Sequence, residues 1–431
     1  MKRPQGVDYA WAASKLNEFR HVQSDGNIVF KSHGLCDFHE IIGIIGTHHD
    51  FGEGIPDIEC RRIITTAVLE AAKNGSLTDA SLKGEILRQS NAYKSRPIKQ
   101  FVLLTSMSVP RPPALTRKAF HDATFFFSDT LPSGITRDGL NVFEFLKPPN
   151  DLPKSFTIVR VRVKARSEFE AYDLGINALD CLRGMWNFRI NRAIASRINA
   201  GVPSKPVNRI RLGPVHSLHD VNGEIATGIY WYDQLTYAET ICERVKDWAA
   251  VQEEEAKLRH LLSLLAYPEF MKQAFVRYTR SLDSSDHDSS FVKLWSLMEY
   301  LTVMRQDENY GEMINRVLFL HADEEYHRQV LEHLRARRNA SVHRGESSSE
   351  MEAFVFQLKQ YVERLMAFHL EIRRQYKSPE EAAELLTRSR NPQELRKQIA
   401  ELKLRLSLAK RALQIHEALS TAPSGSYVER T

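Results

Sequence analysis

The sequence predicts an α+β protein, with a mixed α/β N-terminal region followed by an all-α helical bundle and a C-terminal helical tail. Two observations carry this prediction. Valines alternate with basic residues at 159–164, as in a half-buried strand. From about residue 236, strand patterns disappear and apolar residues recur at helical spacing almost to the end of the chain. The length of 431 residues allows several domains with sizeable cores.

Residues 1–150 are predicted to form one α/β domain of unknown role. Amphipathic stretches indicate helices at 57–74 and 78–93, and short runs rich in Val and Phe indicate strands at 101–109 and 123–127. Asp57 is the expected N-cap of the first helix, and Gly75 lies just beyond its end. A proline-rich stretch at 148–153 indicates the domain boundary.

Residues 151–236 are predicted to form a strand–helix–strand unit with a basic surface. The polar face of the first strand carries Arg160, Arg162 and Lys164. Ser167 and Glu170 match a capping box at the start of a helix, and a further strand is expected at 225–232.

Residues 181–219 contain no Asp or Glu, but they hold seven basic residues with Trp186 and Phe188 among them. Neutralisation of phosphates by cations and stacking on aromatic rings is the chemistry of single-stranded RNA binding. The expected RNA contacts in this run are Arg183, Arg189, Arg192 and Arg197. The alternative is a solvated basic surface whose aromatic residues belong to the core.

Residues 237–377 are expected to form a helical domain, residues 378–420 C-terminal helices, and residues 421–431 a disordered tail. The helices of the domain are expected near 237–265, 267–280, 289–304, 310–320, 323–343 and 350–376. In the tail, apolar residues from Leu395 to Leu413 repeat at alternating spacings of four and three, which makes a short heptad seam. Such a seam is typical of a coiled coil or of packing onto a neighbouring helix.

Charge and cysteine content exclude several classes. The chain has 59 Lys plus Arg against 54 Asp plus Glu, and a net charge of +5 does not by itself indicate nucleic acid. The four cysteines form no C-x-x-C pair, which argues against zinc and disulfide frameworks and fits a reducing cytosol. Because neither a signal peptide nor a membrane-length apolar stretch is recognisable, we expect a cytoplasmic protein without membrane contact. We also expect no metal and no cofactor, since the common nucleotide-binding, hydrolase and zinc motifs do not occur.

Arg338, Asn339 and His343 form an R-N-x-x-x-H motif. Arginine is a permanent cation with a planar fork suited to phosphate oxygens, and histidine exchanges protons near neutral pH. Beside an RNA phosphodiester, His343 would move the proton of the 2′-hydroxyl or of the leaving 5′-oxygen. Arg338 would stabilise the charge that develops on the phosphorane, and Asn339 would orient the arginine or the phosphate.

The Arg-x₄-His spacing alone is not specific, since it occurs six times in the chain, but Arg338 is the one arginine of these six pairs that is followed by Asn. The motif also lies in a basic segment, 331–345, with four Arg and one Glu. Arg337 and Arg344 in this segment are expected to contact RNA. The alternative is a basic helix end at which Arg338 caps backbone carbonyls.

This motif near the end of an all-helical domain resembles the HEPN superfamily, and more closely its Apea-like branch. Residues 291–301, with a Leu-Trp pair and Glu299, are similar to a helix of that branch. The resemblance covers about residues 237–377 and implies a metal-independent endoribonuclease, commonly a toxin or an antiviral abortive-infection effector, that acts as a homodimer with two motifs in one cleft. It implies catalytic roles for Arg338, Asn339 and His343 and an acidic position at Glu299, which is alternatively a plain surface carboxylate.

Two functions follow from the sequence. The first is an RNA-cleaving enzyme whose N-terminal region binds the RNA substrate or senses an unknown trigger ligand or protein. The second is a non-catalytic protein whose helical domain dimerises or binds nucleotide, while the upstream basic region binds RNA. The presence of Arg, Asn and His at all their motif positions favours the first.

Overall fold

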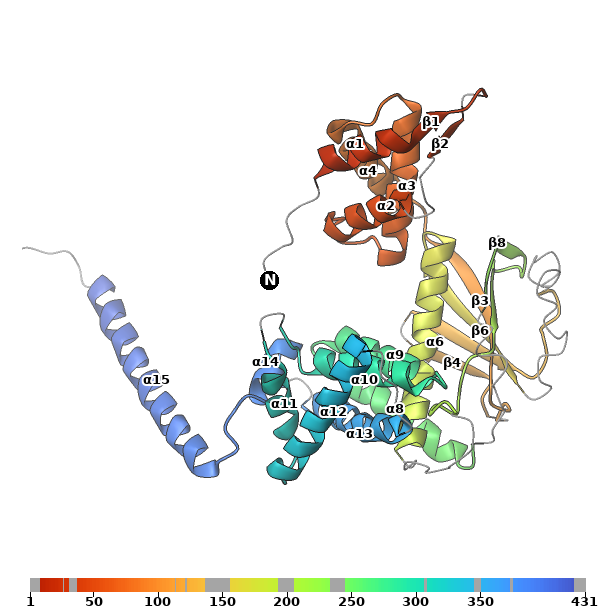
Figure 1. Cartoon of the computed structure of the whole chain (residues 1–431). Helices are drawn as coiled ribbons and strands as arrows, with labels where there is room; N and C mark the ends of the chain where they lie inside the picture. Colours follow the sequence, from red (N-terminus) through yellow and green to blue (C-terminus); the bar gives the residue numbers. More distant parts are fainter. Residues whose placement is uncertain are drawn as a thin grey trace, which may run out of the picture.

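The α+β class is confirmed by 13 helices, a two-stranded hairpin and a six-stranded antiparallel sheet among the described residues (Figure 1). The computed structural model describes residues 8–25, 27–30, 37–112, 114–120, 122–135, 156–192, 205–232, 245–305, 308–344, 350–372 and 375–421. No helix in this described part combines the length and the apolar composition that crossing a bilayer requires.

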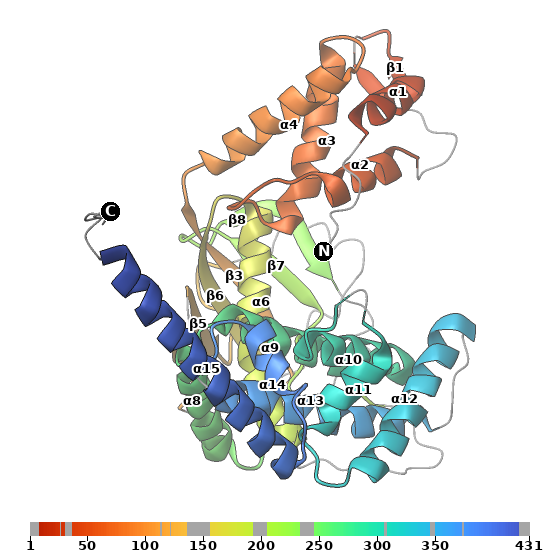
Figure 2. The same cartoon turned by 90° about the vertical axis from the view of Figure 1, so that its left-hand side faces the viewer.

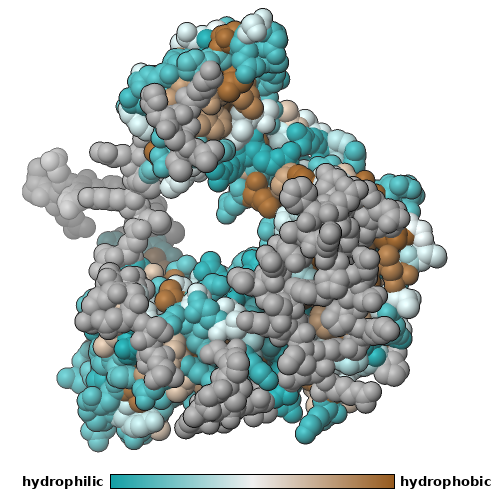
Figure 3. All heavy atoms as spheres, turned by 45° about the vertical axis from the view of Figure 1, so that its right-hand side comes forward, coloured by the Kyte–Doolittle hydropathy of each residue, from teal (hydrophilic) through white to brown (hydrophobic). Residues whose placement is uncertain are grey.

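A helical unit at the N-terminus has a hydrophobic core of its own. Its elements are α1 (Tyr9–Phe19), β1 (Arg20–Val22), β2 (Ile28–Phe30), α2 (Asp37–His48), α3 (Asp57–Lys73) and α4 (Asp79–Lys94). The two predicted helices are confirmed as α3 and α4. The predicted N-cap is wrong by one residue, because Pro56 holds the extended cap position and Asp57 is already helical. The unit stands apart from the helical bundle and joins the molecule beside the sheet (Figures 1 and 3).

The sheet has the strand order β4-β5-β6-β3-β7-β8. Its strands are β3 (Lys99–Met107), β4 (Arg117–Phe120), β5 (Ala123–Ser128), β6 (Thr157–Ala165), β7 (Val215–His219) and β8 (Ile225–Tyr232). The strands predicted at 101–109, 123–127, 159–164 and 225–232 are therefore confirmed. The domain boundary predicted near residue 150 is wrong, because β3 pairs with β6 from Lys99–Ala165 to Met107–Thr157 and so joins both sides of it in one sheet.

Helix α6 (Glu168–Asn191) connects the sheet to the bundle. As predicted, the Ser167 side chain accepts a hydrogen bond from the Glu170 backbone N–H at 3.1 Å and caps the helix. Gly184 lets α6 cross α9 (Pro268–Leu282) closely, because a Cβ there would lie 2.8 Å from the Phe275 carbonyl oxygen. The sheet, α6 and the bundle share one hydrophobic core, so residues 151–236 are not a separate unit.

The helical bundle contains six helices in the order predicted from the sequence. They are α8 (Trp248–Ser263), α9 (Pro268–Leu282), α10 (His287–Leu301), α11 (Tyr310–Leu318), α12 (Glu324–Arg344) and α13 (Met351–Glu371). Helix α10 contacts α9, α12 and α13, and it contributes the fully buried Leu294, Leu297 and Leu301. Helix α12 lies on the side of the bundle away from the sheet (Figures 1 and 2).

The tail comprises α14 (Pro379–Leu385) and α15 (Pro392–Thr421), and α15 stands away from the bundle in Figure 1. Its heptad seam is exposed: Ile399, Leu402, Leu406 and Leu413 are 50%, 60%, 57% and 59% accessible. The alternative in which the seam packs onto a neighbouring helix of the same chain is therefore not found among the described residues.

Candidate active site

The R-N-x-x-x-H motif lies at the C-terminal end of α12, which is continuous through Arg344. Asn339 and His343 are four residues apart and so share a face of the helix. Arg338 and His343 are five residues apart, which separates their directions by about 140° around the helix axis. The side chains of His343 and Arg344 lie outside the described residues.

The Arg338 side chain makes no ion pair within the described part of the chain. Its guanidinium carbon lies 5.3 Å from the centre of the Tyr310 ring, at the start of α11. Its Nη1 donates a 3.4 Å hydrogen bond to Asn339 Oδ1, rather than capping a backbone carbonyl. By contrast, Arg328 of the same helix binds Glu324 at 2.6 Å. The charge of Arg338 is therefore left for an anionic ligand.

Tyr310 links Arg338 to the predicted acidic residue, Glu299 of α10. Burial raises the pKa of Tyr310, as do the charge of Glu299 and a hydrogen bond to it, while Arg338 has the opposite effect. The phenol is therefore protonated at neutral pH and can donate a hydrogen bond. Sequence reasoning missed Tyr310, because no local pattern connects the first residue of α11 to the end of α12.

A hydrogen bond of 3.2 Å from Ser341 Oγ to Asp288 Oδ1 ties the end of α12 to the first turn of α10. The neighbouring His287 is 5% exposed, and burial lowers its pKa. Neither of its ring nitrogens has a hydrogen-bond partner in the described region. His287 is thus a neutral, structural histidine, and the end of α12 is anchored independently of the motif residues.

The prediction that Arg183 contacts RNA is wrong, because its side chain is 2% exposed. Its Nη2 lies 2.6 Å from Asp180 Oδ1 and 2.7 Å from Asp283 Oδ2. Burial by itself would lower the pKa of Arg183, but the charges of Asp283 and Asp180 and their hydrogen bonds raise it. Both acidic partners of this arginine, Asp180 and Asp283, lie outside the run 181–219.

The rest of the basic run does not form one surface. Trp186 and Phe188 are fully buried, so the alternative in which the aromatic residues of this run belong to the core is confirmed, and neither ring is available to RNA bases. Arg189 is half-buried, and the exposed Arg192 lies over Phe188, 3.6 Å from Glu254. Arg197 lies outside the described residues.

The other predicted RNA contact, Arg337, lies beside the motif on a different side of α12. Its guanidinium is 5.6 Å from the centre of the Phe354 ring on α13. Its Nε and Nη2 are buried and have no hydrogen-bond partner within the described region. Arg337 therefore adds positive charge next to Arg338, but with restricted access.

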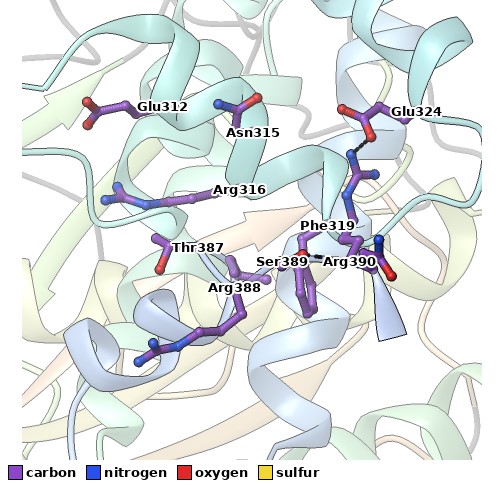
Figure 4. A pocket seen from close by; sticks show the side chains of 11 residues that line it. Glu312, Asn315, Arg316, Phe319, Glu324, Thr387, Arg388, Ser389 and Arg390 are labelled. Carbon is purple, nitrogen blue, oxygen red and sulfur yellow. Dashed lines mark hydrogen bonds and ion pairs between the residues drawn. The ribbon is translucent and has the colours of Figure 1, made fainter. Parts of the chain in front are cut away.

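A cavity of about 560 Å³ opens between α11 and the segment that joins α14 to α15 (Figure 4). Figure 4 shows Arg390 directed at Glu324. Each arginine that lines the cavity forms an ion pair with a glutamate: Arg316 with Glu308, Arg388 with Glu384 and Arg390 with Glu324. The protein's own carboxylates thus neutralise the cavity, which does not include the motif residues.

Comparison of the chain with family models, with curated proteins and with solved structures finds no match. The chemistry of the site therefore has to follow from its own residues. A guanidinium without an ion pair in the described part of the chain, a side-chain amide and a protonated phenol lie together at the end of α12, and the Glu299 carboxylate interacts with the phenol. The guanidinium fork and the amide suit two oxygens of a phosphate group.

Proposed function

We propose that this protein is a metal-independent endoribonuclease. The observation that carries the proposal is the guanidinium of Arg338, which has no ion pair among the described residues and is held over Tyr310 and beside Asn339 on a helix that also carries His343. An arginine in this state can bind and stabilise a phosphate. In this proposal the bundle α8–α13 is HEPN-like, of the Apea-like branch, and the protein is a toxin or an antiviral abortive-infection effector.

Cleavage would proceed by attack of a ribose 2′-oxygen on the adjacent phosphorus, with loss of the 5′-oxygen of the next nucleotide. Neutral His343 takes the proton of the 2′-hydroxyl, and charged His343 returns a proton to the leaving 5′-oxygen. Arg338 stabilises the additional negative charge on the phosphorane. The products are a 2′,3′-cyclic phosphate and a 5′-hydroxyl.

The proposal includes a two-fold homodimer through the helical domain, since the reaction needs a base and an acid and each chain supplies one motif histidine. The directions of Arg338 and His343 differ by about 140° on one helix. Across a two-fold axis, the arginine of one chain and the histidine of the other can reach one phosphate. The exposed seam of α15 would add to this contact.

Replacement of Arg338 by lysine tests the proposal at the residue that carries it. Arg338→Lys keeps a positive charge but loses the fork that holds two phosphate oxygens. We expect kcat for RNA in excess EDTA to fall about 10²-fold with little change in KM, because the lost interaction forms fully only in the transition state. Arg328→Lys, at an ion-paired position of the same helix, is the matched control and should cleave like wild type.

Wild-type kcat in Arg338→Lys would remove Arg338 from the chemistry, and a raised KM alone would make it a substrate-binding residue. If the wild-type protein binds RNA in EDTA without cutting it, the non-catalytic RNA- or nucleotide-binding function becomes the better one.

A further inference from the structure

The outer face of the sheet carries a group of arginines around one aromatic ring. The inner face packs on α6, where Leu103 of β3 lies against Gly175. Because side chains alternate along a strand, Arg160 and Arg162 of β6 point to the opposite face from the buried Val159 and Val161. They share this face with Phe126 of β5, which pairs with Arg160 in the register.

The ring of Phe126 is the centre of the group. The guanidinium carbons of Arg117, Arg160 and Arg162 lie 5.7, 5.3 and 5.1 Å from its centroid. Lys164 extends the row along β6 and is exposed, as is Arg162. We call Arg117, Phe126, Arg160, Arg162 and Lys164 the sheet-face cluster. Cation–π contacts hold three arginines here in fixed positions.

Within the described residues, no ion pair joins the sheet-face cluster to an acidic side chain. Strands β3, β4, β5 and β6 contain no Asp or Glu at all. Asp220 lines the same hollow as Arg160 and Arg162, and its Oδ1 accepts hydrogen bonds from the backbone N–H groups of Asn222 and Glu224. No ion pair joins this carboxylate to the cluster, so no carboxylate in the described ranges compensates its positive charge.

Arg160 shows the consequence most clearly. Its Nε is buried and has no hydrogen-bond partner in the described part of the chain. Burial lowers the pKa of Arg160, and the charge of Arg162 lowers it further. A hollow of about 150 Å³ lies next to both arginines, between this face and the turn after β7. Like charges held together without a counter-ion are unfavourable in the free protein, and a bound anion would relieve them.

We infer that the sheet-face cluster binds single-stranded RNA, with its cations on phosphates and the guanidinium planes and Phe126 as stacking surfaces for bases. Cations two residues apart on β6 lie about 7 Å from each other, so they form a row rather than a single anion site. Positive charge interleaved with an aromatic ring is the usual composition of such a surface. The inference rests on the proposed function, in which RNA is the substrate. It adds a second binding surface, which holds the part of the RNA that lies outside the cleavage site.

The composition of the face favours RNA over a lipid surface. A peripheral membrane site buries exposed apolar side chains in the bilayer. On this face the large aliphatic residues are already buried, with Val102 at 8%, Leu104 at 0% and Ile158 at 4% exposure. The strands of this face expose charged and polar side chains and part of the Phe126 ring, and the one large aliphatic residue exposed in the described lining of the hollow is Val221, at 54%.

The test measures RNA binding without cleavage. Arg162→Gln/Lys164→Gln is made in the His343→Ala background, and binding of a fluorescein-labelled oligouridylate is followed by anisotropy over a series of NaCl concentrations. Since each phosphate contact contributes about 0.7 to the slope of log K against log[salt], we expect a slope flatter by about 1.4 and weaker binding at low salt. Lys73→Gln/Lys83→Gln removes the same charge from exposed positions of the N-terminal unit and should leave the slope unchanged.

Arg162 and Lys164 are exposed, so the variant should keep its fold, which thermal melting checks. Arg117→Gln on β4 repeats the test from another strand, with a slope flatter by about 0.7. Wild-type slopes in both sheet-face variants would overturn the inference. So would unchanged RNA binding together with lost binding to phosphatidylserine vesicles, which would assign the face to membranes.

The outcomes separate this inference from the proposed function. If the wild-type protein cleaves RNA but the sheet-face variants bind like their parent, only the RNA surface is refuted. If the slopes flatten as expected but the wild-type protein cuts no RNA, only the ribonuclease is refuted.

Discussion

His343→Ala is expected to lower kcat for RNA cleavage by about 10²–10⁴-fold while RNA affinity changes little. The magnitude is what a positioned general acid–base normally contributes. Affinity should persist, because the imidazole acts on protons in the transition state, whereas the phosphate is bound by arginines. Single-turnover cleavage in EDTA gives the rate, and anisotropy with a labelled RNA gives the affinity.

The matched control is His333→Ala. His333 is an exposed histidine of the same helix, packed edge-on against Phe354, and has no role in the proposed chemistry. It should cleave at the wild-type rate. A folded His343→Ala protein that also cleaves at this rate would leave the ribonuclease proposal without its proton-transfer group.

Arg183→Ala is expected to destabilise the protein by about 3–5 kcal/mol, the usual cost of removing one partner from a buried ion pair. Asp180 and Asp283 both bind this guanidinium, and Asp180 is almost fully buried. Among the described residues, Asp180 would keep an ion pair with Arg280 alone, at 2.7 Å. Denaturant unfolding followed by circular dichroism measures the change in the free energy of unfolding.

Arg192→Ala, near the end of the same helix, is the control for Arg183→Ala. Its side chain is 42% exposed and 3.6 Å from Glu254, so its loss should cost no more than about 0.5 kcal/mol. Unfolding of Arg183→Ala at the wild-type denaturant midpoint would contradict the structural role of Arg183 and return it to the RNA-contacting candidates.

Sequence patterns predicted α3, α4, α6, four strands and the helices of the bundle, because periodicity is a local property, but they missed α1, α2 and the short strands β1, β2, β4 and β7. The alternation at Val159, Val161 and Val163 and the helical spacing after residue 236 both correspond to observed elements. The prediction of a domain boundary at residue 150 was wrong because it depended on contacts between distant parts of the chain. The pairing of β3 with β6 joins strands about 60 residues apart, and the composition of neither strand indicates which strand it pairs with.

The burial of charged residues was the second feature that sequence patterns did not predict. Arg183 and Arg192 look alike in sequence, as two arginines of one basic run. One is buried against Asp283, a hundred residues further along the chain, and the other is exposed. At the candidate site, the motif predicted Arg338 and Asn339 as neighbours at the end of a helix. It gave no sign of Tyr310, whose contact with Arg338 depends on how α11 packs beside α12.

The most direct test of the ribonuclease proposal is the chemistry of the RNA ends produced by the wild-type protein in excess EDTA. The proposal predicts 2′,3′-cyclic phosphate and 5′-hydroxyl ends, and no cut at a position where the attacking ribose is replaced by 2′-deoxyribose. Ends with a 3′-hydroxyl and a 5′-phosphate, or cleavage at the deoxy-substituted position, would contradict attack by the 2′-hydroxyl.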